Sequence, residues 1–206
     1  MSLPAKYAVM PEKDAKEVLN AEVAGVIRAL EEDRGFMLPK NLAEHRRMQG
    51  EKKLEPIIEW LSDQLENNIP IVCFAYHRSV IAKLVEHFKE AAPAVITGDT
   101  SAQERFDAVQ KFQSGGTNLF IGQINAAGVG ITLTRSSTVC LAELDWSPAV
   151  LAQAWDRVHR IGQVNTVDVY YFVVKDSLDE SINNVVVSRA RIFKKVLDGD
   201  STEARA

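Results

Sequence analysis

Short apolar runs alternate with amphipathic segments through most of this chain. Five runs rich in aliphatic and aromatic residues predict strands: residues 69–76, 94–97, 118–122, 138–144 and 167–174. The first of them, IPIVCFAY, is apolar without alternation, which is typical of a strand buried on both faces of a parallel sheet. Between the runs, apolar residues recur at three- and four-residue steps and predict helices. This alternation predicts an α/β fold in which a mostly parallel sheet lies between two helical layers.

The N-terminal part of the chain has a different pattern. Residues 11–30 place apolar side chains at helical spacing, so we expect an amphipathic helical appendage that packs on another element. Residues 45–53, HRRMQGEKK, are polar and basic, and we expect a linker that leads into a helix. This cluster either contacts a DNA backbone or is simply solvated. The resulting division is an N-terminal helix and linker (1–50), an α/β lobe (51–198) and a flexible tail (199–206).

Polar and small residues follow the predicted strands. Arg78 lies in the turn after the run at 69–76, and Gly98 lies in the turn after the run at 94–97. Because ligands of open α/β sheets bind at the carboxyl ends of the strands, we expect a site along this edge. Ser79 is the expected N-cap of the helix that follows, and Ser101 has Glu104 at the spacing of a capping box.

Composition changes this picture little. The chain has 206 residues, 46% hydrophobic and 25% charged, as is ordinary for a globular domain, and no apolar run has the length of a membrane span. The net charge of −4 does not indicate nucleic-acid binding, so any such site must be a local patch. Cys73 and Cys140 lie in apolar runs, where we expect buried, reduced thiols. The four histidines lack metal-ligand spacing, so no metal site is expected.

The segment 153–163, QAWDRVHRIGQ, carries the most distinctive chemistry. Arg157 and Arg160 lie near the expected end of a helix, where a spacing of three residues places both guanidinium groups on one face. Gly162 is the expected stop signal of that helix. The planar, permanently charged guanidinium group suits bidentate binding of phosphate. The pair therefore predicts a phosphate-binding site.

A loop rich in small residues strengthens this hypothesis. Gly128 and Gly130 would let the backbone approach a polyphosphate closely and point N–H groups at it. The alternative is that both arginines only favour the helix dipole and pair with Asp156 or Glu143.

QAWDRVHRIGQ closely resembles motif six of the Swi/Snf family of ATP-dependent DNA translocases, in helicase superfamily two. The resemblance implies a RecA-like lobe, the C-terminal one of a two-lobe motor. It implies that Arg160 is an arginine finger that reaches the γ-phosphate of ATP bound by the other lobe. By the same resemblance, Arg157 contacts phosphate or couples the lobes, and Gln153 belongs to the nucleotide-binding set.

Other segments resemble DNA-facing motifs of this family. ITGDTSAQERFDAVQKFQ resembles the block in which Thr97 and Gly98 would meet the DNA backbone, with turn chemistry alone as the alternative. The turn with Arg78 resembles motif four, so this arginine is a candidate phosphate contact or else an exposed loop arginine without a role. Asn125 is a further candidate for a DNA phosphate. We expect Arg105 to be structural.

QINAAGVGITLT, residues 123–134, resembles motif five with several departures. Gln123 and Ile124 stand where the family commonly has serine and threonine, which weakens a role for these two. The remaining candidates for nucleotide coupling are Gly128, Gly130 and Thr132. AELDWSP, residues 142–148, resembles the version found in the HepA-related annealing-helicase branch.

The sequence has no G-x-x-x-x-G-K-[ST] and no D-E-x-H acid pair. In the family these belong to the N-terminal lobe, so the resemblance implies that ATP is shared between lobes and that Mg²⁺ is held by the missing one. We expect this chain alone to be inactive, its partners to be double-stranded DNA and the N-terminal RecA-like lobe of the same protein, and no membrane. The expected location is the cytoplasm (nucleoid) in bacteria or phage, or the nucleus in a eukaryote.

Two other classes stay open. One is a non-catalytic lobe that binds DNA or a partner, against which the intact arginine motif argues. The other is a stand-alone α/β enzyme, for which the sequence offers no nucleophile–base pair.

Overall fold

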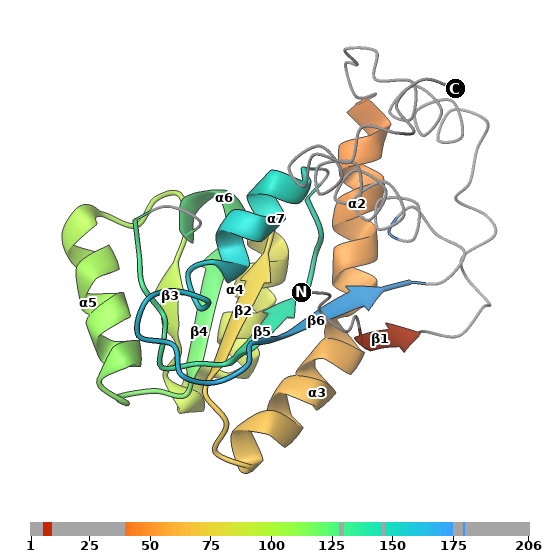
Figure 1. Cartoon of the computed structure of the whole chain (residues 1–206). Coiled ribbons are helices and arrows are strands. Elements are labelled where there is room, and N and C mark those ends of the chain that lie inside the picture. The colour runs from red at the N-terminus through yellow and green to blue at the C-terminus, as the bar shows by residue number, and fades with distance from the viewer. Residues whose placement is uncertain (1–5, 10–39, 128–129, 146, 175–178, 180–206) are drawn as a thin grey trace, which may run out of the picture.

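A computed structural model describes residues 6–9, 40–127, 130–145, 147–174 and 179. Its centre is a six-stranded sheet in the order β1-β6-β5-β2-β4-β3, and every strand pair is parallel (Figure 1). The strands are β1 (Lys6–Val9), β2 (Ile71–Ala75), β3 (Ala94–Ile96), β4 (Leu119–Gln123), β5 (Thr138–Leu141) and β6 (Asp168–Val173). The fully buried β2 lies between β4 and β5, as its continuous apolar sequence requires.

Helices cover both faces of the sheet. They are α2 (Lys40–Lys52), α3 (Leu54–Glu66), α4 (Arg78–His87), the 3-10 helix η2 (Lys89–Ala91), α5 (Ala102–Gln113), α6 (Ile124–Ala127) and α7 (Pro148–Trp155). Side chains of α3 and α4 form one apolar cluster with the sheet, while side chains of α5, α6 and α7 form the other. The three-layer α/β/α architecture is thus confirmed.

The predicted strands are all present, and most are shorter than the apolar runs. The run at 138–144 ends as a strand at Leu141, because Glu143 turns its carboxylate to the backbone of a neighbouring turn. Cys73 and Cys140 are buried free thiols, as expected, and they face each other in the register of β2 and β5. Strand β1, which pairs with β6, was not anticipated.

Two local predictions were wrong. The expected linker at 45–53 lies mostly within α2, whose contacts with the rest of the chain are polar and therefore invisible to an apolar pattern. The N-cap of α4 is His77, so Ser79 lies inside the helix. The capping box of Ser101 and Glu104 is confirmed. Pro148 lies in the first turn of α7, where its fixed φ suits the start of a helix.

Several predictions lie outside the described residues. These are the helix at 11–30, the tail at 199–206, and all but one residue of a last helix that Ser177 would cap, with Glu180 at the spacing of a capping box. The domain division stays a prediction. Within the described part of the chain, no helix is long and apolar enough to cross a membrane.

Candidate functional site

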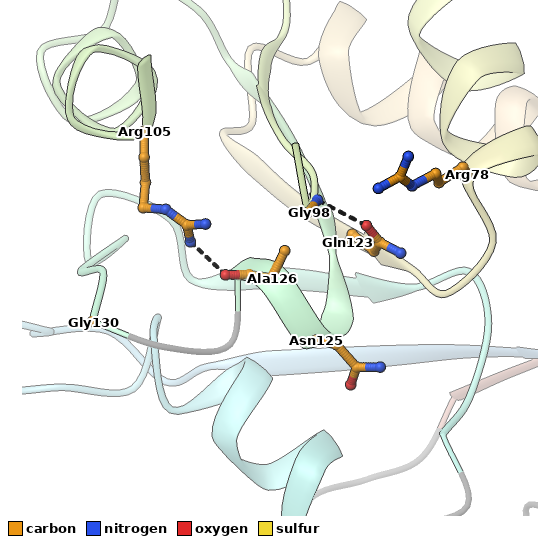
Figure 2. Close-up of a pocket in the computed structure, with 7 residues that line it drawn as sticks. All are labelled: Arg78, Gly98, Arg105, Gln123, Asn125, Ala126 and Gly130. Atoms are coloured by element: carbon orange, nitrogen blue, oxygen red, sulfur yellow. Dashed lines mark hydrogen bonds between the residues drawn. The ribbon is translucent and has the colours of Figure 1, made fainter. Parts of the chain in front are cut away.

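The carboxyl edge of the sheet holds an open pocket of about 650 Å³. Its lining comes from the start of α4, the turn after β3, the end of β4, the helices α5 and α6, and Gly130 (Figure 2). The lining residues are Arg78, Gly98, Arg105, Gln123, Asn125, Ala126 and Gly130. Three of the four DNA-binding candidates, Arg78, Gly98 and Asn125, are therefore brought together at one place.

Arg78 is held by an exposed carboxylate. Its guanidinium group makes a two-point contact with Asp99, with Nη2–Oδ1 and Nη1–Oδ2 distances of 2.8 and 2.5 Å. The side chains are 59% and 74% exposed, so this ion pair adds little stability and a competing anion can replace the carboxylate. Arg78 is thus available to a phosphate at the pocket wall.

Gln123 joins two of the turns. Its side-chain Oε1 accepts a hydrogen bond from the Gly98 amide at 3.0 Å, and its Nε2 donates to the Tyr76 carbonyl at 3.3 Å. Thr97 is engaged locally, because its amide donates to the Thr100 hydroxyl at 2.8 Å and its hydroxyl lies 3.4 Å from the same oxygen. Turn chemistry therefore accounts for Thr97, while Gln123 positions a wall of the pocket.

Arg105 has a larger place in the site than its sequence suggested. It extends from α5 toward α6, where Nη1 donates to the Ala126 carbonyl (Figure 2). A guanidinium group has five N–H donors, so this contact leaves donors free for a ligand of the pocket. The pocket consequently carries two cationic side chains, Arg78 and Arg105, from different elements.

The second group of candidates lies in a turn and not on a helix. Helix α7 ends at Trp155, and residues 156–165, here called the arginine loop, follow it as turns. The prediction that a helix carries Arg157 and Arg160 near its end, with both guanidinium groups on one face, was therefore wrong. Gly162, at φ +102°, ends the turns and not the helix. The sequence has no strong helix stop signal at Trp155. In the structure, the Val158 and His159 amides both donate to the Trp155 carbonyl, so the chain keeps coiling briefly after the helix ends.

The arginine loop is fastened to residues 131–136, which begin within the segment that resembles motif five and extend just past its end. The Leu133 amide donates to the Arg157 carbonyl at 2.7 Å. The Gln163 side chain donates to the carbonyls of Thr134 and Ser136 at 3.1 and 2.6 Å. These contacts join residues nearly thirty positions apart in the sequence. No local pattern could therefore predict that Gln163 fixes the loop.

Arg160 completes this contact. Its Nη1 donates to the Ile131 carbonyl at 3.2 Å and to the Thr132 hydroxyl at 3.1 Å, while the residue remains exposed. Gly130 adopts φ +74°, and a Cβ there would meet nothing within 4 Å, so the backbone is open to a ligand. The predicted set of Gly130, Thr132 and Arg160 is thus assembled in one surface.

The other nucleotide candidates have simpler surroundings. Arg157 is half-buried, and its Nε donates to the Gln153 carbonyl at 2.9 Å. Gln153 itself is exposed. Gly128 lies outside the described residues. Within the described part of the chain, neither arginine of the loop pairs with Asp156 or another acid, which weakens the alternative of a purely structural pair.

Glu143 instead belongs to a buried polar cluster at the ends of β2 and β5. Its Oε2 accepts the Tyr76 and His77 amides at 2.9 and 2.8 Å, and its Oε1 lies 2.6 Å from His77 Nδ1. Burial alone raises the pKa of Glu143, but the hydrogen bonds from the side chain and backbone of His77 hold that pKa below its usual range. Glu143 is therefore a fixed anion that holds the turn from which Arg78 emerges.

Helix α2 closes over this cluster. Arg46, which is 7% exposed, donates to the Leu144 carbonyl at 2.6 Å and lies 4.5 Å above the centre of the Tyr76 ring. A Cβ at Gly50 would lie 2.3 Å from Glu143 Oε1, so any side chain there would displace the carboxylate from its position. Lys53 is buried too, at 2.6 Å from Asp179. Arg46 and Lys53 are thus structural, and the DNA-contact reading of this basic cluster does not hold for them.

The described residues contain no group of three histidine, cysteine or acidic side chains able to hold a metal ion. The three-layer α/β/α architecture, with a parallel sheet and a basic pocket on its carboxyl edge, is that of a RecA-like lobe. The model of the helicase conserved C-terminal domain matches residues 52–162, more than half of the chain. The chain belongs to this family, as a C-terminal lobe of the Swi/Snf type.

Curated relatives support the same assignment. The chain is 35% identical over 147 residues to a SWI/SNF-related matrix-associated actin-dependent regulator of chromatin subfamily A-like protein 1 from Xenopus laevis, covering 69% of this chain and 15% of that protein. It is 32% identical over 158 residues to the human DNA annealing helicase and endonuclease ZRANB3, covering 75% and 15%. An uncharacterized ATP-dependent helicase of Mycoplasma pneumoniae is 31% identical over 166 residues, covering 79% and 16%. The chain thus spans about 15% of the length of these relatives.

A solved structure agrees on the fold. The crystal structure of the C-terminal part of the Fun30 ATPase domain superposes with a TM-score of 0.60 at 24% identity, covering 65% of this chain and 44% of that one. The RecA-like fold is confirmed.

Proposed function

We propose that this chain is the C-terminal motor lobe of a DNA-dependent ATPase. Arg160 is the arginine finger, and Arg157 is a second phosphate or coupling contact. ATP lies between this lobe and a partner lobe that supplies the phosphate-binding lysine and holds Mg²⁺. The observation that carries the proposal is the exposed Arg160 guanidinium, tethered at Nη1 to Ile131 and Thr132 with donors to spare.

This tether suits the proposed chemistry. Charge that develops on a transferring phosphoryl group is best stabilised by a donor that is already oriented, because no reorganisation is then needed during the reaction. The two bonds of Nη1 limit how far the guanidinium can turn, and the adjoining Gly130 leaves room for a phosphate. Closure of the lobes would bring Arg160 to the γ-phosphate, and opening would withdraw it.

The pocket on the carboxyl edge is the proposed DNA track. Arg78 and Arg105 offer guanidinium donors, and Asn125 is an exposed amide beside them. Contacts of this kind bind the phosphate backbone without reading the sequence of the bases. Gly130 lines this pocket and also adjoins the arginine loop, which supports coupling between DNA and nucleotide. The chain would act where its DNA lies, in the cytoplasm (nucleoid) of a bacterium or in a nucleus.

The test is ATP hydrolysis with duplex DNA by this chain joined to, or mixed with, its nucleotide-binding lobe. We expect Arg160→Ala to lower the DNA-stimulated rate by on the order of 10³-fold, since an arginine finger contributes at least that much to phosphoryl transfer. Arg160→Lys should fail as well, because an ammonium group cannot reproduce the fork. DNA affinity should stay nearly unchanged in both variants.

Lys89→Ala is the matched control. Lys89 is an exposed cation of η2 that contacts Glu86 at 3.2 Å, and it lies before the amino end of β3, whereas the site lies at the carboxyl edge of the sheet. Its removal should leave hydrolysis at the wild-type rate. Near-normal hydrolysis by Arg160→Ala would reject the arginine-finger assignment and favour a lobe that only binds DNA or a partner.

A further inference from the structure

Four large apolar side chains are exposed in the described part of the chain, and two of them lie in the arginine loop. Ile161 is 100% exposed and Val164 is 89% exposed, against 59% for Phe106 on α5 and 48% for Met48 on α2. A single exposed aliphatic residue is common on protein surfaces. Ile161 and Val164 are two branched aliphatic residues within four positions, and they lie where the chain is proposed to meet another lobe. Their exposure therefore needs a physical explanation.

The backbone holds Ile161 outward. The Gln163 amide donates to the Arg160 carbonyl at 2.9 Å, which closes a turn with Ile161 and Gly162 at its two central positions. Gly162 adopts φ +102°, a conformation that a side chain at this position would oppose. Gln163 fastens the base of the turn to the Thr134 and Ser136 carbonyls. The isoleucine is therefore presented at the tip of a tied turn.

We propose that Ile161 and Val164 form an apolar contact with the nucleotide-binding lobe when the two lobes close around ATP. This rests on the proposed function, in which Arg160 reaches a nucleotide held by that lobe. Consecutive Cα atoms lie 3.8 Å apart, so a surface that comes within reach of Arg160 also meets its neighbour Ile161. Removing both side chains from water favours the closed state.

The chemistry of the patch selects its occupant. A branched aliphatic side chain offers no hydrogen bond, so it fits an apolar hollow of a protein. Against a charged surface, it would displace water from the charges without replacing the lost hydrogen bonds. The sugar-phosphate backbone of DNA is such a charged surface, and the basic pocket already offers it cations. The partner is thus the nucleotide-binding lobe, through an apolar patch at the rim of its nucleotide site.

The chain permits a direct test, because its only two cysteines, Cys73 and Cys140, are fully buried. In the two-lobe protein, Ile161→Cys introduces one accessible thiol into the turn, and Phe106→Cys introduces a matched one on α5. The rate of alkylation by iodoacetamide is measured with and without a non-hydrolysable ATP analogue, in the absence of DNA. We expect the analogue to slow alkylation of Ile161→Cys about tenfold, as closure of some 90% of the molecules would give. The rate for Phe106→Cys should not change.

A second variant tests the contribution of the contact. Ile161→Ser combined with Val164→Ser should lower DNA-stimulated hydrolysis about tenfold, which corresponds to ~1.4 kcal/mol less favourable closure. DNA affinity and the thermal midpoint of the chain should stay at wild-type values, because both side chains are exposed in the open lobe.

The outcomes separate the inference from the function on which it rests. An unprotected thiol together with normal hydrolysis by the double serine variant would overturn the apolar contact and leave the arginine finger intact. A wild-type protein that neither hydrolyses ATP nor closes would overturn the proposed function and the contact with it. Protection that appears without the nucleotide-binding lobe and grows with protein concentration would assign the patch to self-association and overturn the inference.

Discussion

A single carboxylate organises the carboxyl edge of the sheet. Glu143 is 4% exposed, and it accepts two backbone amides and faces His77, while Gly50 leaves it the space that it occupies. A buried anion is costly unless hydrogen bonds replace the water that it loses. Here they do, and the pKa of Glu143 lies below its usual range even though burial acts in the opposite direction.

The lowered pKa makes the contribution of Glu143 dependent on pH. A carboxyl group whose pKa is lower in the folded state stabilises the fold above its unfolded-state pKa, and this stabilisation is lost as the pH falls through the folded-state pKa. We expect Glu143→Gln to lower the free energy of unfolding at pH 7 by about 2 kcal/mol, the usual cost of impairing buried hydrogen bonds. Thermal unfolding between pH 7 and pH 3 should show a steeper loss for the wild type than for this variant.

Glu86→Gln is the control for that series. Glu86 is 78% exposed and contacts Lys89 at 3.2 Å, so its removal should leave both the midpoint and its pH dependence near wild type. If wild type and Glu143→Gln lost stability in parallel on acidification, Glu143 would not be the charged group that the hydrogen bonds indicate.

At the scale of elements, the arginine loop depends on a partner segment and not on helical structure. Helix α7 ends before Arg157, and the loop keeps its place through Leu133, Arg160 and Gln163. A loop fixed by side chain–backbone bonds can hold a guanidinium group in a chosen orientation while remaining exposed. It also becomes sensitive to the loss of one amide side chain.

Gln163→Ala should therefore loosen the loop without unfolding the lobe. Removing the bonds to the Thr134 and Ser136 carbonyls should lower the local opening free energy by about 1–3 kcal/mol. Amide hydrogen exchange at Leu133, whose N–H donates to the Arg157 carbonyl, should accelerate roughly ten- to hundredfold as a result. Gln103→Ala, which removes an exposed bond to Asp107 on α5, should leave that amide unchanged. Equal exchange in both variants would mean that Gln163 does not hold the loop.

At the scale of the whole molecule, the net charge of −4 opposes a polyanion, so the proposed attraction to DNA must be local. The pocket would supply this attraction with Arg78 and Arg105, while Asp99 competes for Arg78. If substitutions of Arg78 and Asp99 changed DNA affinity in opposite directions, the effect would indicate a local contact at the pocket and not a response to net charge.

Arg78→Ala should weaken duplex binding and reduce the slope of log affinity against log salt by about 1, as the loss of one phosphate contact requires. Asp99→Asn should strengthen binding, because it frees the guanidinium group. Lys89→Ala removes the same charge at η2, before the amino end of β3, and should change affinity little. Fluorescence anisotropy over a salt series measures all three. Equal losses for Arg78→Ala and Lys89→Ala would show that overall charge, not the pocket, governs binding.

The sequence predicted what depends on apolar pattern and local turn chemistry. The run at 69–76 was recognised as a strand because β2, which lies within it, is buried on both faces, and Ser101 was recognised because its capping partner lies three residues away. Helix α2 was not predicted because it packs through Arg46 and Gly50. In the sequence these residues resemble those of a solvated linker, and only the structure shows that Gly50 lies beside Glu143 and that Arg46 is buried. The true end of α7 depends on tertiary bonds to the loop, which no local signal records.

The pairing of β1 with β6 has a consequence for biosynthesis. Lys6 lies opposite Tyr170, so β1 must wait for β6, the last of the described strands to be made. Among the described strands only β6 borders β1, so β1 lacks its partner in the sheet until some 160 residues have followed. Contacts this distant in sequence slow folding, because a long loop must close before they form. We therefore expect β2 to β5 to assemble during translation, and the edge formed by β1 and β6 to join only once the ribosome has released residues beyond Val173.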